Sequence, residues 1–181
     1  MNKQILAATT LSVGATSGIG SIASQPRITR WYSRLRKPSY VPPNRVFPVA
    51  WTTLYADIAV TSATAIDRLR AAGRDKEARN YIVALAANLI LNAGWSWLFF
   101  RYRKLGAAAV GAAALTVSSA DLARRAADAR VGAAVLAASS ADLARRTAAA
   151  DPRAGAALAP YPLWCAFAAV MSSHIWVLNR R

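Results

Sequence analysis

Long runs of residues without charge are the feature that most restricts how this chain can fold. A helix that crosses the hydrocarbon core of a bilayer, roughly 30 Å thick, needs about 20 mostly apolar residues. Four runs reach that length with little or no charge: residues 5–23, 46–66, 81–100 and 159–179. In lipid a helix satisfies its own backbone hydrogen bonds. The sequence therefore predicts an all-α integral membrane bundle.

The first run, residues 5–23, allows two interpretations. Lys3 followed by an apolar stretch that ends in small residues is also the pattern of a secretory signal with its cleavage site. However, the run is longer than a usual signal core. Gly14, Gly18 and the serines near them have the small-residue spacing that lets helices pack closely in lipid. We favour a retained membrane helix.

An alanine-rich segment, residues 111–151, contains a tandem duplication. The sequence SSADLARR occurs at residues 118–125 and again at residues 139–146, a period of 21 residues. Two copies are too few for a solenoid. If only the first copy spans the membrane, as a helix over about residues 105–123, the bundle has five transmembrane helices. If both copies span, it has six. We predict five, in a single domain that covers the whole chain.

Basic residues outnumber acidic ones by 23 to 8, which gives a net charge of +15. Nucleic-acid-binding proteins share such an excess. Here the basic residues lie between the apolar runs, where they would meet anionic lipid headgroups. We therefore predict a multi-pass membrane protein with the bilayer as its partner, and no nucleic-acid partner. The basic residues divide too evenly between the two sides for the positive-inside rule to set the orientation. The use of alanine and arginine is typical of a GC-rich bacterium, which indicates the bacterial cell membrane.

Several kinds of chemistry find no support in the sequence. Cys165 is the single cysteine and His174 the single histidine, so the chain has no internal disulfide and no ligand set for a structural zinc ion. It also has no glycine-rich phosphate loop, no nucleophile elbow and no paired carboxylates. We predict no catalytic residues, no metal and no intrinsic cofactor.

Aromatic side chains recur along three of the predicted helices at spacings that place them on one face. The three stripes are Trp51, Tyr55 and Ile58; Asn88, Asn92, Trp95 and Phe99; and Trp164, Ala168, Met171 and Ile175. Facing inward, they would line a flat apolar cavity with a few polar groups, which suits a large planar ligand that stacks on indole rings. The alternative is that the tryptophans and tyrosines form interfacial belts, which are common in membrane proteins.

Asp57 is the one carboxylate within the run 46–66, and helical spacing places it nearly opposite Trp51 and Tyr55. A carboxylate inside a membrane is costly and is a functional candidate by default. One hypothesis is a proton relay in a transporter. The other is a protonated residue that only hydrogen-bonds to a neighbouring helix.

Three motifs together identify the chain with a known family. The segment from Trp31 reads WYSRLRKPSYVPPNRVFPVAWTTLY, residues 91–100 read LNAGWSWLFF, and residues 160–168 read PYPLWCAFA. In this order and spacing they resemble the TspO/MBR family, which comprises tryptophan-rich sensory proteins and translocator proteins and is also called the peripheral-type benzodiazepine receptor family.

The resemblance implies a five-helix membrane protein, usually a homodimer, whose pocket binds tetrapyrroles such as protoporphyrin IX or heme and other aromatic small molecules. Trp51 and Trp164 match the two tryptophans that the family uses for porphyrin. Together with the stripes it gives these candidate ligand-binding residues: Trp51, Tyr55, Asn92, Trp95, Phe99, Trp164 and Ala168. The loop over residues 25–45 matches the lid of the pocket, with Trp31, Arg34, Lys37, Pro42 and Pro43 as its candidate residues.

The function that follows is a membrane receptor or transport protein for tetrapyrroles with a regulatory or stress-sensing role, and not an enzyme. Two alternatives remain open: a light-dependent enzyme that degrades porphyrin, and a proton-coupled transporter that uses Asp57. The chain departs from the family at this aspartate, where members usually have a small neutral residue. It also departs at Ser173, which replaces the tyrosine of the cholesterol motif of animal members.

Overall fold

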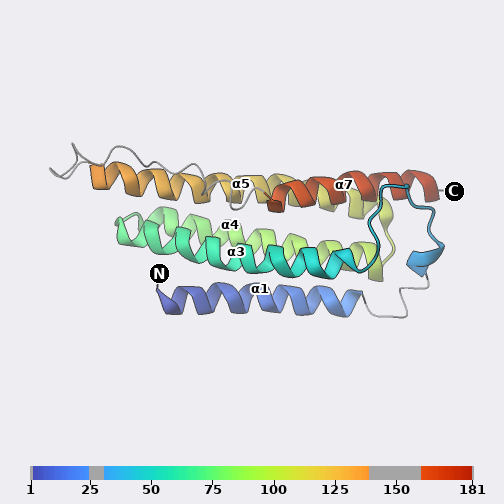
Figure 1. Ribbon diagram of the computed structural model, residues 1–181, viewed down its shortest axis with the longest axis horizontal. Coiled ribbons are helices and arrows are strands. Elements are labelled where there is room, and N and C mark those ends of the chain that lie inside the picture. Colours follow the sequence, from blue (N-terminus) through green and yellow to red (C-terminus); the bar gives the residue numbers. More distant parts are fainter. Residues whose placement is uncertain (1, 25–30, 139–159, 181) are drawn as a thin grey trace.

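The computed structural model describes residues 2–24, 31–138 and 160–180, and all regular structure in these residues is helical, as predicted. The long elements are α1 (Lys3–Ala23), α3 (Val46–Ala71), α4 (Asp75–Ser96), α5 (Leu105–Ala138) and α7 (Pro160–Asn179) (Figure 1). A π-helical turn, η1 (Trp97–Arg101), continues α4.

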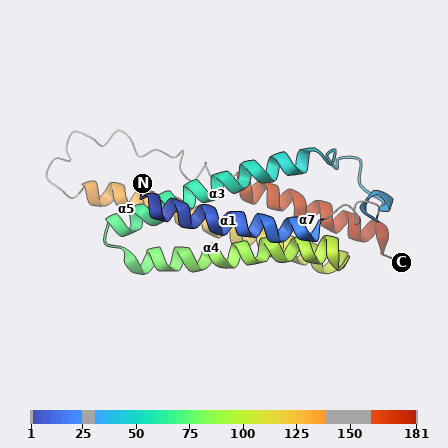
Figure 2. The same cartoon turned by 90° about the horizontal axis from the view of Figure 1, so that it is seen from below.

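The helices lie along one long axis and stack in three layers (Figures 1 and 2). In Figure 1, α5 and α7 lie side by side in the top layer, α3 and α4 form the middle layer, and α1 packs beneath both of them. The segment 31–45, which joins α3 to the residues after α1, lies at the same end of the bundle as the C-terminus. The N-terminus points toward the other end.

Two helices extend beyond the apolar runs that predicted them. α3 continues past residue 66 to Ala71, and α4 begins at Asp75, before residue 81. Asp75 and Glu77 lie in the first turn of α4, where acidic side chains stabilise the positive end of the helix dipole. Arg74 pairs with Glu77 just at that start. Charged residues therefore end the apolar run but not the helix.

α5 is also longer than the predicted helix over residues 105–123, since it ends at Ala138. Alanine has the highest helix propensity, and no proline interrupts the segment. Asp121 forms ion pairs with Arg124 at 2.6 Å and with Arg125 at 2.5 Å, one turn further along the same helix. The second copy of the repeat lies mostly outside the described residues. The prediction about a sixth spanning helix therefore also lies outside them.

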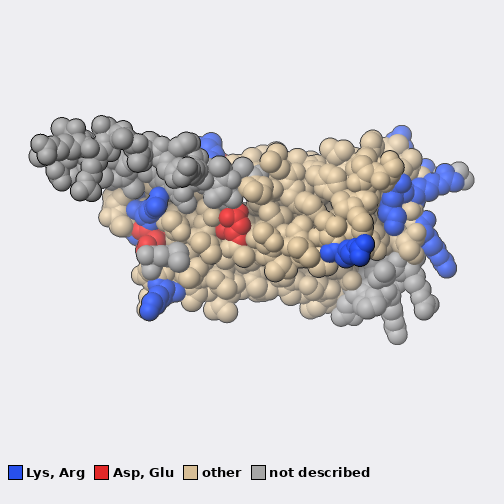
Figure 3. Space-filling model, viewed as in Figure 1, with Lys and Arg blue, Asp and Glu red and all other residues tan. Residues whose placement is uncertain are grey.

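Four of the described segments are long and apolar enough to cross a membrane: Lys3–Ala23, Asp75–Arg101, Leu105–Ala129 and Pro160–Asn179. α3 is as long, but Trp51, Tyr55, Asp57 and several threonines make it less apolar. Lys and Arg gather toward the two ends of the long axis, and the middle of the face in Figure 3 is largely uncharged. Apolar side chains point outward along the helices, among them Leu11, Val83, Ile90, Val110 and Leu163. This surface suits a bilayer.

Candidate ligand cavity

A cavity of about 520 Å³ opens between α1, α3, α4 and the segment 31–45. The largest side chains in its walls are aromatic: Phe47, Trp51 and Tyr55 from α3, Trp95, Phe99 and Phe100 from α4 and η1, and Tyr32 from the loop. α1 contributes small residues, including Ser17, Gly20 and Ser21, and α7 contributes Met171. Gly20 packs closely against α4 here, since an added Cβ would lie 3.3 Å from the Ser96 hydroxyl oxygen.

The α3 wall follows directly from helical spacing. The rings of Trp51 and Tyr55, four residues apart, lie with centroids 5.4 Å apart and planes at 33°. Ile58, next on the stripe, is completely buried below them. Trp164 of α7 meets the Trp51 ring edge-on, with centroids 6.4 Å apart. Trp164 therefore supports Trp51 from behind and is not itself among the residues that line the cavity.

The α4 wall depends on the change from α-helix to π-turn. Trp95 and Phe99 stack with centroids 5.3 Å apart and planes at 25°. Phe99 and Phe100, consecutive in sequence, both line the cavity. On an α-helix consecutive side chains point about 100° apart, and the wider π-turn brings both toward one side. Sequence reasoning missed Phe100, as well as Phe47 and Tyr32; the one signal for Phe100 is its place in the LNAGWSWLFF motif.

Asn92 lies behind the cavity wall rather than on it. It is 2% exposed, and both ends of its side-chain amide have partners. Its Oδ1 accepts a hydrogen bond from the Tyr55 hydroxyl at 2.8 Å, and its Nδ2 donates to the Tyr161 hydroxyl at 3.0 Å. Ala168 is likewise nearly buried, and Met171, one turn further along α7, is the residue that lines the cavity. Direct ligand contact by Asn92 or Ala168 stays a prediction.

The segment 31–45 closes one end of the cavity. Trp31 and Tyr32 both pack their rings against Phe99, with centroids 6.1 Å away in each case. The Lys37 ammonium lies 4.2 Å from the centre of the Tyr32 ring and donates to the Tyr32 carbonyl oxygen at 3.1 Å. Burial raises the pKa of the Tyr32 phenol above its ordinary value, so this hydroxyl stays neutral at the cavity wall.

The same segment is fastened to α7 at two points. The Asn179 side chain accepts from the Arg36 backbone N–H at 3.1 Å and donates to the Arg36 carbonyl oxygen at 2.9 Å. The Tyr40 hydroxyl and His174 Nδ1 lie 2.7 Å apart. Pro42 and Pro43 precede α3, and the Pro43 carbonyl oxygen accepts from the Val46 N–H at the start of that helix.

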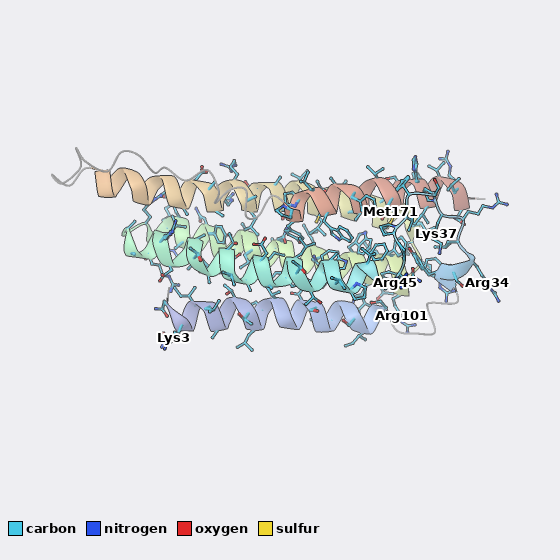
Figure 4. The ribbon with its side chains drawn as sticks, viewed as in Figure 1. Lys3, Arg34, Lys37, Arg45, Arg101 and Met171 are labelled. Carbon is cyan, nitrogen blue, oxygen red and sulfur yellow. The ribbon has the colours of Figure 1, made fainter. Side chains whose placement is uncertain are left out.

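Cationic side chains surround this end of the bundle. Figure 4 shows Arg34, Lys37, Arg45 and Arg101 there, whereas Lys3 lies at the opposite end. An anionic group on a bound molecule would therefore meet positive potential at the loop.

Asp57 lies apart from the cavity. Its Oδ1 accepts a hydrogen bond from Thr61 one turn along α3, at 3.1 Å. Its Oδ2 is buried and has no hydrogen-bond partner among the residues that the structure describes. The Trp95 indole N–H is also buried and likewise has no hydrogen-bond partner among the described residues.

The fold and the cavity define a class: an all-helical membrane protein with an aromatic, loop-covered cavity at one end of its helix bundle. The sequence model of the TspO/MBR family matches residues 6–177. The chain belongs to this family and is a multi-pass membrane protein.

Several relatives carry names from this family. Protein CrtK of Rhodobacter capsulatus is 28% identical over 92% of this chain and 85% of its own length. The translocator protein of Ovis aries is 32% identical over 83% of this chain and 76% of its own length. Tryptophan-rich protein TspO of Chlorobaculum tepidum is 38% identical over 55% of this chain and 63% of its own length. These names support a membrane receptor or sensory role.

Proposed function

We propose that this protein is a membrane receptor or transport protein that binds porphyrins or other tetrapyrroles in the aromatic cavity, with a regulatory or stress-sensing role, rather than an enzyme. The observation that carries the proposal is a cavity of about 520 Å³ lined by stacked aromatic rings under a cationic loop. Sites for small molecules commonly have volumes of about 300–1,000 Å³ and mostly apolar walls.

The chemistry of a porphyrin matches the two parts of the site. Its planar macrocycle would stack on Trp51 and Tyr55 on one side and on Trp95 and Phe99 on the other. Its propionates would extend toward the loop end, where Arg34 and Lys37 lie. Because the cations sit outside the aromatic walls, the charged groups of the ligand would remain near water.

The membrane arrangement is part of the same proposal. α3 is the fifth spanning helix, since it lies along the same axis as α1 and α4 and packs against α1, α4 and α5. Part of its polar and aromatic set faces the bundle, including the buried Thr61 and Ser62 and the cavity-lining Trp51 and Tyr55, which helps explain why its sequence is less apolar than that of the other four. A homodimer is the assembly that we expect for a member of this family.

The test is a titration of the purified protein with protoporphyrin IX in the dark, followed by tryptophan fluorescence. We expect saturable quenching. Trp51→Phe should raise the dissociation constant about two- to tenfold, since a lost aromatic contact costs about 0.5–1.5 kcal/mol, and Trp164→Phe should raise it less because Trp164 acts through Trp51.

The matched control is Trp176→Phe on the same helix as Trp164. Trp176 is 40% exposed and stacks with Arg180 away from the cavity, so its removal should leave affinity unchanged. Unchanged binding in both the Trp51 and Trp164 variants would refute the site. Subsequent illumination separates the alternatives: loss of porphyrin absorbance that requires Trp51 would indicate the photodegrading enzyme instead of a binder.

A second candidate function, proton-coupled transport, is favoured by one observation: the Oδ2 of Asp57 is buried and has no hydrogen-bond partner within residues 2–24, 31–138 and 160–180. A carboxylate in such a position can bind and release a proton as the bundle changes shape. Uptake of protoporphyrin into proteoliposomes under a pH gradient tests it. Uptake that is equal in the wild type and in Asp57→Asn would remove this candidate.

A further inference from the structure

A chain of buried hydrogen bonds runs from the cavity wall across the bundle. It begins at Tyr55 and Asn92, passes through Tyr161 and Asn88, and ends at Ser119. The Tyr161 hydroxyl donates to Asn88 Oδ1 at 2.9 Å, and Asn88 Nδ2 donates to the Ser119 hydroxyl oxygen at 3.3 Å. The chain thus crosses α3, α4, α7 and α5. Tyr55 is its only member among the residues that line the cavity.

The far end of the chain sets the direction of every bond in it. The Ser119 hydroxyl donates to the Leu115 carbonyl oxygen at 2.6 Å, and a carbonyl can only accept. The Ser119 oxygen therefore accepts a hydrogen bond from Asn88 Nδ2, which also donates to the Ser118 hydroxyl oxygen at 3.1 Å. The amide nitrogen of Asn88 thus faces the serines and its oxygen faces Tyr161. By the same reasoning, the single hydroxyl proton of Tyr161 is directed to Asn88.

The same constraint reaches the cavity. Because Tyr161 has no proton left, it must accept from the Asn92 nitrogen, which turns the Asn92 oxygen toward Tyr55. Tyr55 has one hydroxyl proton, and it is committed to that oxygen at 2.8 Å. This chain of hydrogen bonds uses none of the lone pairs of the Tyr55 oxygen.

We infer that the Tyr55 hydroxyl is a fixed hydrogen-bond acceptor for the bound molecule, so that among otherwise similar planar aromatic ligands the cavity favours those with an N–H or O–H donor on their edge. The inference rests on the proposed binding function and makes it more specific. Aligned hydrogen bonds polarise one another, which makes the oxygen at the start of the chain a better acceptor. A ligand without a donor would cover this acceptor and leave it unpaired, which disfavours binding.

The test compares 2-naphthol with 2-methoxynaphthalene, which have the same fused rings but differ in the O–H donor. Each probe is titrated against protoporphyrin IX bound to the protein in lipid nanodiscs, and its displacement of the porphyrin is measured. Protein-free nanodiscs provide the correction for partitioning into lipid. We expect 2-naphthol to bind about tenfold more tightly, as is typical for one buried hydrogen bond. In Tyr55→Phe the two probes should bind about equally.

Two further variants separate the role of the chain from that of folding. Tyr161→Phe cuts the chain one residue behind Asn92, so the amide is free to turn; we expect a smaller preference for 2-naphthol with little change for the ether. Tyr102→Phe is the matched control, because Tyr102 is 60% exposed and belongs to neither the chain nor the cavity. It should keep the full preference.

The outcomes distinguish this inference from the proposed function. Equal displacement by both probes in the wild type, failure of both to displace, or a preference that survives Tyr55→Phe would overturn the inference while protoporphyrin binding stands. An unchanged preference in Tyr161→Phe would overturn the role of the chain. Absence of saturable protoporphyrin binding would overturn the proposed function and the inference with it.

Discussion

Replacing Asn92 with leucine should destabilise the bundle more than it weakens ligand binding. The substitution removes two interhelical hydrogen bonds, at 2.8 Å to Tyr55 and 3.0 Å to Tyr161, from a side chain that is 2% exposed. Hydrogen bonds between membrane helices contribute on average about 0.6 and at most about 1.7 kcal/mol each. We therefore expect Asn92→Leu to lower the free energy of unfolding by about 1–3 kcal/mol.

The assay is reversible unfolding in mixed micelles with increasing SDS, together with the protoporphyrin titration on the same samples. A double-mutant cycle with Tyr55→Phe should give a coupling of about 0.6–1.7 kcal/mol for that one bond. The dissociation constant should rise less than about twofold, below the effect expected for Trp51→Phe. A rise of tenfold or more in Asn92→Leu with unchanged stability would refute this reasoning, since it would make Asn92 a ligand contact.

Three other changes have expected outcomes at the cavity. Gly20→Leu should abolish protoporphyrin binding, because even a Cβ there lies 3.3 Å from the Ser96 oxygen and the side chain would enter the cavity; retained affinity in a folded variant would contradict the assigned walls. Asn179→Ala removes two hydrogen bonds to the Arg36 backbone, so we expect faster hydrogen exchange in the loop and a several-fold faster dissociation of porphyrin in stopped-flow measurements. Lys37→Gln should weaken binding more at low than at high ionic strength, and an effect independent of salt would exclude an electrostatic role.

The helices were predictable from the sequence because lipid requires long uncharged segments, and the runs around Leu11, Ile90 and Val170 supply them. Their ends were less predictable. Arg74 and Glu77 form an ion pair at the start of α4, outside any apolar run. Such charged pairs end an apolar run, but they stabilise the helix. Whether five helices span depends on α3, some of whose polar residues, such as Thr61 and Ser62, are buried in the bundle, and hydropathy does not report this packing.

The cavity was partly predictable for a similar reason. Trp51 and Tyr55 share a face by α-helical spacing, and their rings do pack together. Phe100 could not be placed in this way, because it shares a side with Phe99 only through the π-turn of η1. Tyr32 comes from the loop, where no periodicity exists, and its position depends on contacts with Phe99 and Phe100 that only the folded chain provides.

The stripe of Asn88, Asn92, Trp95 and Phe99 along α4 divides into two halves with different roles. Its polar half, Asn88 and Asn92, is buried and forms its hydrogen bonds with other helices. A polar group inside a membrane needs such partners within the protein. Its aromatic half, Trp95 and Phe99, faces the cavity. Spacing placed the four residues on one face but could not tell a residue that binds a helix from one that faces a ligand. Tyr55 lies where the two halves meet, with its ring in the cavity wall and its proton in the buried chain. A change in the polar half should therefore affect the ligand mainly through the hydrogen bond that the Tyr55 oxygen accepts from it.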